Sequence, residues 1–192
     1  MEARTLEAGR GLRLMFWGEL LFLTAVVCIL LEILSPAFPT AGKVLAAVSF
    51  LFSLFGLATA ARAYAGYQSA LVFLVVSIIL WATVNWVEDG WPAMLLNAAC
   101  SVINYFVVAR VCLASADLLF RRRDADGARQ ITRVRLCYLV CSAVSVACFL
   151  AGVLPGLGVL TEIVWAVGVV VSLFAGLIYL LLLRAVQEWM RN

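Results

Sequence analysis

The chain has 192 residues, of which 66% are apolar and 13% charged, and its formal net charge is +3. Globular proteins contain about 45–50% apolar and about 25% charged residues, so this composition argues against a water-soluble fold, a disordered chain or a disulfide-rich secreted scaffold. Histidine is absent, which removes the commonest general acid or base and the commonest metal ligand. We therefore expect an all-α integral membrane protein with no catalytic residues, no metal site and no cofactor.

The apolar segments predict six transmembrane helices within one domain that covers residues 1–192. We place these helices approximately at residues 12–34, 43–63, 69–87, 92–120, 132–153 and 159–186. Most contain an uncharged run of about 18 residues or more, which is near the minimum for crossing about 30 Å of hydrocarbon. The first segment carries Glu19 and Glu32 inside its apolar stretch, which argues against a cleaved signal peptide.

Turn sequences join these helices into three hairpins, and basic residues follow every second helix. Of the 14 Lys and Arg residues, all except Lys43 fall on one side when the helices alternate in direction. The positive-inside rule then predicts a multi-pass protein of the cell membrane with both termini in the cytoplasm. Anchoring to anionic lipid of the bilayer explains these arginines, so we expect no nucleic-acid partner.

Small residues recur at intervals of three or four in several helices, which in lipid allows helix backbones to approach closely. The second helix contains Ser49, Ser53, Gly56 and Ala60, and the sixth contains Gly168, Ser172 and Gly176. These faces predict close packing within the chain, or with a second copy or another membrane subunit. The six cysteines lie in apolar surroundings and are expected to pack there rather than to form disulfides or a metal site.

Polar residues towards the outer ends of the helices indicate a candidate ligand site. Ser77, Trp81, Asn85 and Glu88 share one helical face, and Asn97, Ser101 and Asn104 share another. The candidate ligand-binding residues are Glu32, Trp81, Asn85, Glu88, Asn97, Asn104, Glu162 and Trp165. Carboxylates, amides and indoles suit a cation through charge, hydrogen bonds and cation–π contact. A structural interpretation stays open, because tryptophans also mark membrane interfaces and asparagines also join helices.

Glu19 and one charged stretch of the sequence need separate interpretations. Glu19, in the inner third of the first helix, is either an ion or proton ligand or the salt-bridge partner of a helix-end arginine, and the salt bridge is the favoured interpretation. The stretch from Asp124 to Arg129 is expected to be a charged loop.

Two functions remain open. The first is a transport component that binds a small polar or cationic solute or ion from the outer side. The second is a noncatalytic scaffold or partner subunit that acts through helix packing and a basic cytoplasmic face. We expect no enzymatic activity, because the sequence contains no phosphate-binding loop, no Gly-x-Ser-x-Gly and no His-Glu-x-x-His pattern.

Overall fold

The computed structural model describes residues 2–31, 37–87, 90–121, 124–151 and 159–191, and for residues 2–5, 159–162 and 191 it describes the backbone alone. This part of the chain is all-helical. The long helices are α1 (Glu2–Leu30), α2 (Ala37–Ala63), α3 (Gln68–Val84), α4 (Trp91–Arg121), α5 (Ala125–Ala151) and α6 (Val159–Arg191), and a short 3-10 helix, η2 (Ala65–Tyr67), precedes α3. All six are long and apolar enough to cross a membrane, α3 together with η2 as one span from Ala65 to Val84.

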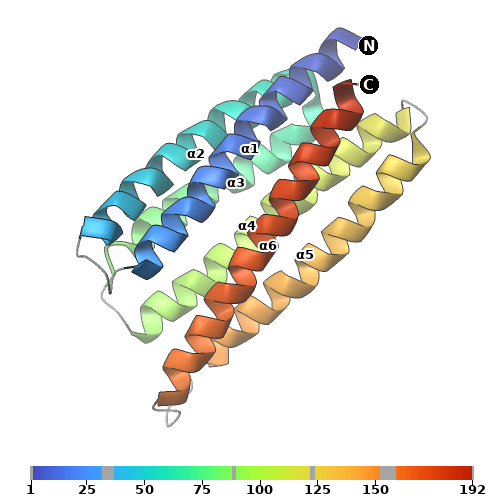
Figure 1. The fold of residues 1–192 in the computed structure, drawn as a ribbon. Helices are drawn as coiled ribbons and strands as arrows, with labels where there is room; N and C mark the ends of the chain where they lie inside the picture. Colours follow the sequence, from blue (N-terminus) through green and yellow to red (C-terminus); the bar gives the residue numbers. More distant parts are fainter. Residues whose placement is uncertain (1, 32–36, 88–89, 122–123, 152–158, 192) are drawn as a thin grey trace.

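The six helices form a closed ring in chain order (Figure 1). Each helix packs against the next, and α6 returns to pack against α1. Neighbours run in opposite directions, so the N- and C-termini lie at the same end of the bundle, which we call the terminal end. The opposite end is called the far end. Among neighbouring pairs, α2 and α3 pack most sparsely.

The closest packing joins α1 and α2 along small residues. A β-carbon added at Gly11 would lie 2.5 Å from the carbonyl oxygen of Gly56, and one added at Gly56 would lie 2.6 Å from the carbonyl oxygen of Gly11. Gly18 is held in the same way against Ser49 and Ser53. The small-residue face expected on the second helix is therefore used within the chain.

The small residues of α6 also pack within the chain. A β-carbon added at Gly168 would lie 3.1 Å from the β-carbon of Cys148 on α5. One added at Gly176 would lie 2.7 Å from Leu23 Cδ2 on α1. Through these small residues, α6 packs closely against both of its neighbours in the ring, α5 and α1.

Two helices begin earlier than the sequence pattern predicts. The stretch expected as a loop forms the first turn of α5 from Ala125 onwards, and Asp124 precedes it as an N-cap residue, since its Oδ1 accepts the backbone N–H of Gly127 at 2.9 Å. α1 begins at Glu2 and not near residue 12. Hydropathy marks the part of a helix at membrane depth, whereas charged residues with good helix propensity continue the same helix beyond it.

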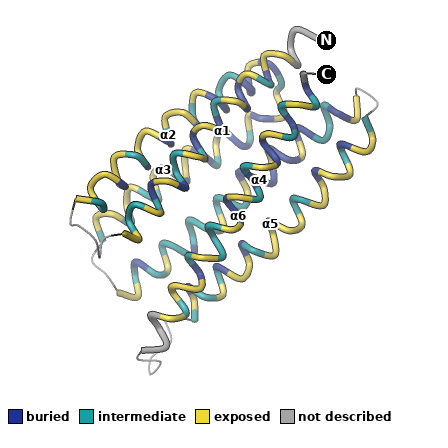
Figure 2. Tube along the Cα trace, viewed as in Figure 1, coloured by how far each residue is buried: buried dark blue, intermediate teal, exposed yellow. Residues whose placement is uncertain are grey.

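Buried side chains concentrate in the half of the bundle nearest the termini (Figure 2). Leu12, Leu57 and Tyr67 are each 0% exposed there and belong to one continuous apolar cluster, which we call the terminal core. Within it, the hydroxyl groups of Tyr67 and Ser115 share a hydrogen bond of 2.9 Å. The ring is therefore filled with side chains at the terminal end.

The contact between α1 and α2 gives the first prediction. Gly56→Ala should lower the free energy of unfolding by about 1–3 kcal/mol, because the new methyl group meets backbone atoms of α1. Gly9→Ala is the matched control, since a β-carbon there would lie 3.7 Å from the β-carbon of Met190, an ordinary contact. Thermal unfolding of both variants in detergent, followed by circular dichroism, checks this prediction. Equal melting temperatures for the two variants would show that this contact is not tight.

Candidate functional site

A cavity lies at the centre of the ring and is lined by residues from all six long helices. Its volume is about 290 Å³, near the lower limit of the roughly 300–1,000 Å³ typical of small-molecule sites. Its lining combines apolar side chains with polar ones that include Glu19, Ser53, Asn97, Asn104, Ser142 and Tyr179. The polar residues come from α1, α2, α4, α5 and α6, so the ring closure is what brings them together.

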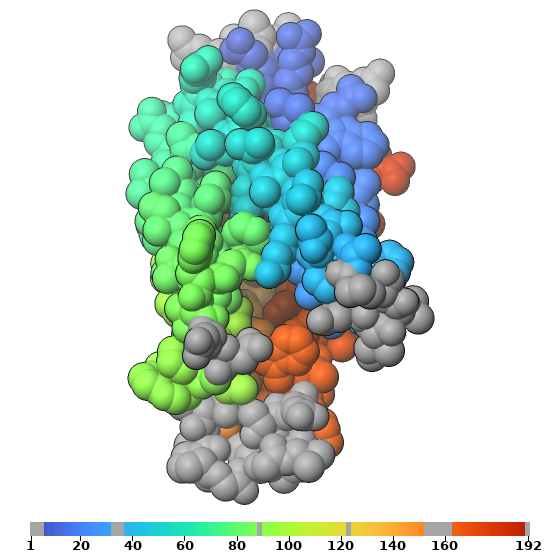
Figure 3. All heavy atoms as spheres, turned by 90° about the vertical axis from the view of Figure 1, so that its left-hand side faces the viewer, coloured from blue at the N-terminus to red at the C-terminus, as the bar shows by residue number. Residues whose placement is uncertain are grey.

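The molecular surface is hollowed between α2 and α3 in the half away from the termini (Figure 3). This hollow follows the sparsely packed α2–α3 seam. Phe22, Phe50 and Trp81 line the cavity as an aromatic cluster, with the Phe50 ring centroid 5.1 Å from that of Trp81 and 5.8 Å from that of Phe22. Because the terminal core fills the other half, the cavity is accessible from the far half of the bundle.

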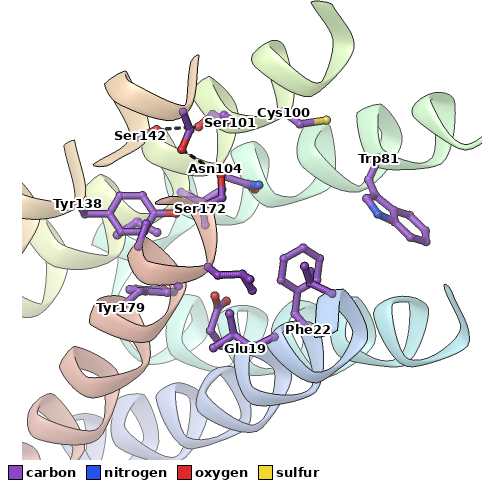
Figure 4. A pocket seen from close by; sticks show the side chains of 18 of the residues that line it. Glu19, Phe22, Trp81, Cys100, Ser101, Asn104, Tyr138, Ser142, Ser172 and Tyr179 are labelled. Carbon is purple, nitrogen blue, oxygen red and sulfur yellow. Dashed lines mark hydrogen bonds between the residues drawn. The ribbon is translucent and has the colours of Figure 1, made fainter. Parts of the chain in front are cut away.

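Glu19 is the one residue with a formal charge among the described residues that line the cavity. Its carboxyl group points into the space between Tyr179 and Phe22 (Figure 4). A β-carbon added at Gly176 would approach Glu19 Oε1 to 3.1 Å, so the absence of a side chain at Gly176 makes room for the carboxyl group. The close packing of α1 against α6 thus determines the position of the only formal negative charge in this described lining.

The favoured expectation that Glu19 pairs with an arginine was wrong for the part of the chain that is described. The ion pairs found there join Arg121 to Asp117, Arg129 to Asp126 and Arg184 to Glu188. All three lie on exposed helix surfaces, where arginine side chains reach water. Glu19 instead faces the interior of the ring and forms no ion pair with any arginine whose side chain the structure describes.

Tyr179 is a second polar group in the cavity without a partner. The residue is 4% exposed, and its hydroxyl group forms no hydrogen bond with any described residue. Leaving a buried hydroxyl group unpaired costs about 1–3 kcal/mol. Figure 4 shows Tyr179 beside Glu19, so one ligand could contact both groups.

Other polar residues of the cavity join helices to each other. Ser77 Oγ donates to Asn104 Oδ1 at 2.6 Å and links α3 to α4. Ser172 Oγ donates to Ser145 Oγ at 3.0 Å, and Ser145 Oγ donates to the Gly168 carbonyl oxygen at 3.2 Å, which links α5 to α6. Asn104 therefore has the structural role that was weighed against ligand binding, although it also lines the cavity.

Of the residues predicted from the sequence, Trp81, Asn97 and Asn104 line this cavity. They come from the helical faces predicted for the third and fourth helices. Glu32 and Glu88 lie outside the described residues, and so does the side chain of Glu162.

Asn85 and Trp165 do not line the cavity. Asn85 is the C-cap residue of α3 and keeps a helical backbone conformation, with its N–H donating to the Trp81 carbonyl oxygen at 3.4 Å. Asn85 is exposed, and its amide Nδ2 donates to the Trp81 carbonyl oxygen at 2.8 Å. Trp165 is 40% exposed on α6, as expected of a tryptophan that faces lipid.

The site list from sequence left out Glu19 and Tyr179. A signal for Glu19 was present, because a carboxyl group inside an apolar segment is a functional candidate by default. Tyr179 stands in an apolar run of the sixth helix and carries no comparable signal. Its importance depends on its neighbour Glu19, which lies far from it in the sequence.

Comparison with protein families, with curated proteins and with solved structures finds no match for this chain. We therefore assign it to no family. Its function must be argued from the geometry of the cavity.

The hydrogen bond between Ser77 and Asn104 gives the second prediction. Asn104→Leu, Ser77→Ala and the double variant form a thermodynamic cycle, for which we expect a coupling free energy of about 0.6 kcal/mol and at most about 1.7 kcal/mol. Asn104→Leu alone should be the most destabilising, because it leaves the 1%-exposed Ser77 without its acceptor. Unfolding measured in detergent tests this cycle, and strictly additive effects would exclude a structural role for the pair.

Proposed function

We propose that this chain is a transport component that binds a small organic monocation in its central cavity. The observation that supports the proposal most directly is the unpaired carboxyl group of Glu19 inside the ring. A charged group within a membrane span is costly, and such groups are commonly associated with ion or substrate pathways. Either a proton or a bound cation neutralises it, and the cavity supplies room for the cation.

The lining favours an amine that has a small apolar part. One carboxylate balances one positive charge, and the neighbouring Tyr179 hydroxyl can accept an N–H group of the ligand. Phe22 and Trp81 offer aromatic faces for cation–π contact and for the apolar substituent. Among the described residues, no group of three His, Cys, Asp or Glu side chains could hold a metal ion. This chemistry is closer to an organic cation than to a multivalent metal.

The proposal includes an orientation in which both termini are cytoplasmic. Arg13, Arg62, Arg121 and Arg184 lie towards the terminal end, whereas Lys43 lies near the start of α2 at the far end. By the positive-inside rule, the terminal end then faces the cytoplasm and the hollow between α2 and α3 opens in the outer half. The chain accordingly captures solute from outside, and release inwards requires the terminal core to separate.

The scaffold hypothesis has less support from the packing. It relies on small-residue faces, and those of α2 and α6 are already used within the chain. Gly168→Leu would disturb the contact of α6 with Cys148 and Phe149 on α5. Loss of assembly in that variant would therefore report a damaged fold and would not distinguish a scaffold from a binding protein.

The third prediction tests cation binding by thermal stability. Phenethylamine should stabilise the detergent-purified protein, whereas 2-phenylethanol, which has a similar shape and no charge, should not. At a concentration of 100 times Kd the expected gain is about 2.7 kcal/mol. Glu19→Gln should abolish the gain, because the amide carries no charge. Glu7→Gln, an exposed residue on the same helix, is the matched control and should keep it.

Without amine, Glu19→Gln should be at least as stable as the wild type, because Glu19 has no ion-pair partner among the described residues to lose. Equal stabilisation of the wild type and Glu19→Gln by phenethylamine would contradict the proposal. So would equal effects of the amine and the alcohol. The absence of any shift over a panel of primary and quaternary amines would favour the scaffold hypothesis.

A further inference from the structure

A second cavity lies between α1 and α6 at the terminal end, separate from the central one. Its volume is about 620 Å³, and its lining includes Arg10, Arg13 and Trp17 of α1 with Arg184, Gln187 and Glu188 of α6. We call it the terminal groove. Its lining residues come from α1 and α6, the first and last helices, which pack together to close the ring.

The terminal groove is basic. Arg10 and Arg13 are exposed and form no ion pair with any side chain that the structure describes. Arg184 Nε pairs with Glu188 Oε1 at 3.3 Å, so three guanidinium groups and one carboxylate leave a net charge of +2. Guanidinium groups bind phosphate oxygens through paired, charge-assisted hydrogen bonds. The groove is thus suited to a phosphate group.

The same groove has an apolar wall. Phe16 and Trp17 follow the arginines along α1 and, like them, belong to its apolar span from Leu6 to Leu30. Their rings pack edge to face with centroids 5.7 Å apart, and Trp17 is 46% exposed. A water-soluble anion would leave this aromatic wall uncovered. An amphiphile with an anionic head covers both the charges and the wall.

We propose that the terminal groove binds one anionic phospholipid. Its phosphate is held by Arg10 and Arg13 of α1 and by Arg184 of α6, and an acyl chain lies against Trp17. Anionic lipid is attracted in a general way to every basic helix end of the chain. This groove differs from the other helix ends because it brings three arginines from two helices to one place. The proposal does not depend on cation binding in the central cavity.

The bound lipid has a structural consequence, because it bridges the two helices that close the ring. Across this seam Gln187 Nε2 donates to the Leu12 carbonyl oxygen at 3.2 Å. The lipid adds a further polar link between α1 and α6, through its phosphate. It therefore stabilises the closed ring whether or not the central cavity is occupied.

Native mass spectrometry of the full chain in detergent tests the proposal, with dioleoyl phosphatidylglycerol and dioleoyl phosphatidylcholine as probes of equal chain length. We expect one retained phosphatidylglycerol and preferential binding over phosphatidylcholine. The triple variant R10Q/R13Q/R184Q should weaken phosphatidylglycerol binding about tenfold or more. The control R62Q/R110Q/R133Q removes three other exposed arginines from α2, α4 and α5 and should change binding less than about twofold.

Three results would overturn the proposal. Equal binding of the two lipids would remove its charge basis, and equal losses in the two triple variants would show a general basic surface. Full displacement of the lipid by millimolar glycerol 3-phosphate would assign the groove to a soluble phosphate. If R10Q/R13Q/R184Q fails to fold, the single variant Arg13→Gln compared with Arg62→Gln decides the question by the same measurement.

Discussion

The close approach of α1 and α2 is the contact on which the other features depend. Lipid chains are as apolar as the side chains that face them, so helices in a membrane associate mainly through close backbone packing and interhelical hydrogen bonds. Gly11 and Gly18 lie on one face of α1 and bring it against Gly56, Ser49 and Ser53 of α2. Glu19 directly follows Gly18 and is turned from it by about 100° around the helix. The contact that holds Gly18 against α2 therefore directs Glu19 into the ring.

The two halves of the bundle differ in how completely they are filled. At the terminal end, Leu12, Leu57 and Tyr67 belong to a continuous core, and the chain termini lie there with many of the arginines. Towards the far end the sparse seam between α2 and α3 leaves a hollow beside a cavity with aromatic and polar walls. A bundle that is closed at one end and accessible at the other is suited to capture solute from one side. The proposed lipid site lies at the closed end, so the two sites are separated along the bundle.

The sequence predicted some of the cavity and missed its central group. Trp81, Asn97 and Asn104 line the cavity because helical spacing holds within α3 and within α4. Asn85 departs from the pattern because, at the exposed end of α3, its side-chain amide bonds back to the Trp81 carbonyl oxygen of its own helix. For Glu19 a salt bridge was favoured over an ion or proton ligand, since nothing in a linear sequence shows whether a helix turns a carboxyl group towards an arginine or towards the interior of a ring.

Composition and hydropathy alone determined that the chain is apolar enough for a membrane and contains six long helices. The reason is that backbone polar groups exposed to lipid are costly, so each apolar segment must satisfy its own backbone hydrogen bonds as a helix. The sequence also determined that nearly all its cationic residues are arginines in a few clusters. Only the tertiary structure decided which polar groups meet. Glu19 and Tyr179 come together in the cavity, and Arg13 and Arg184 line one groove. Such pairs depend on the rotation of each helix about its axis, which is set by backbone contacts between residues far apart in the sequence.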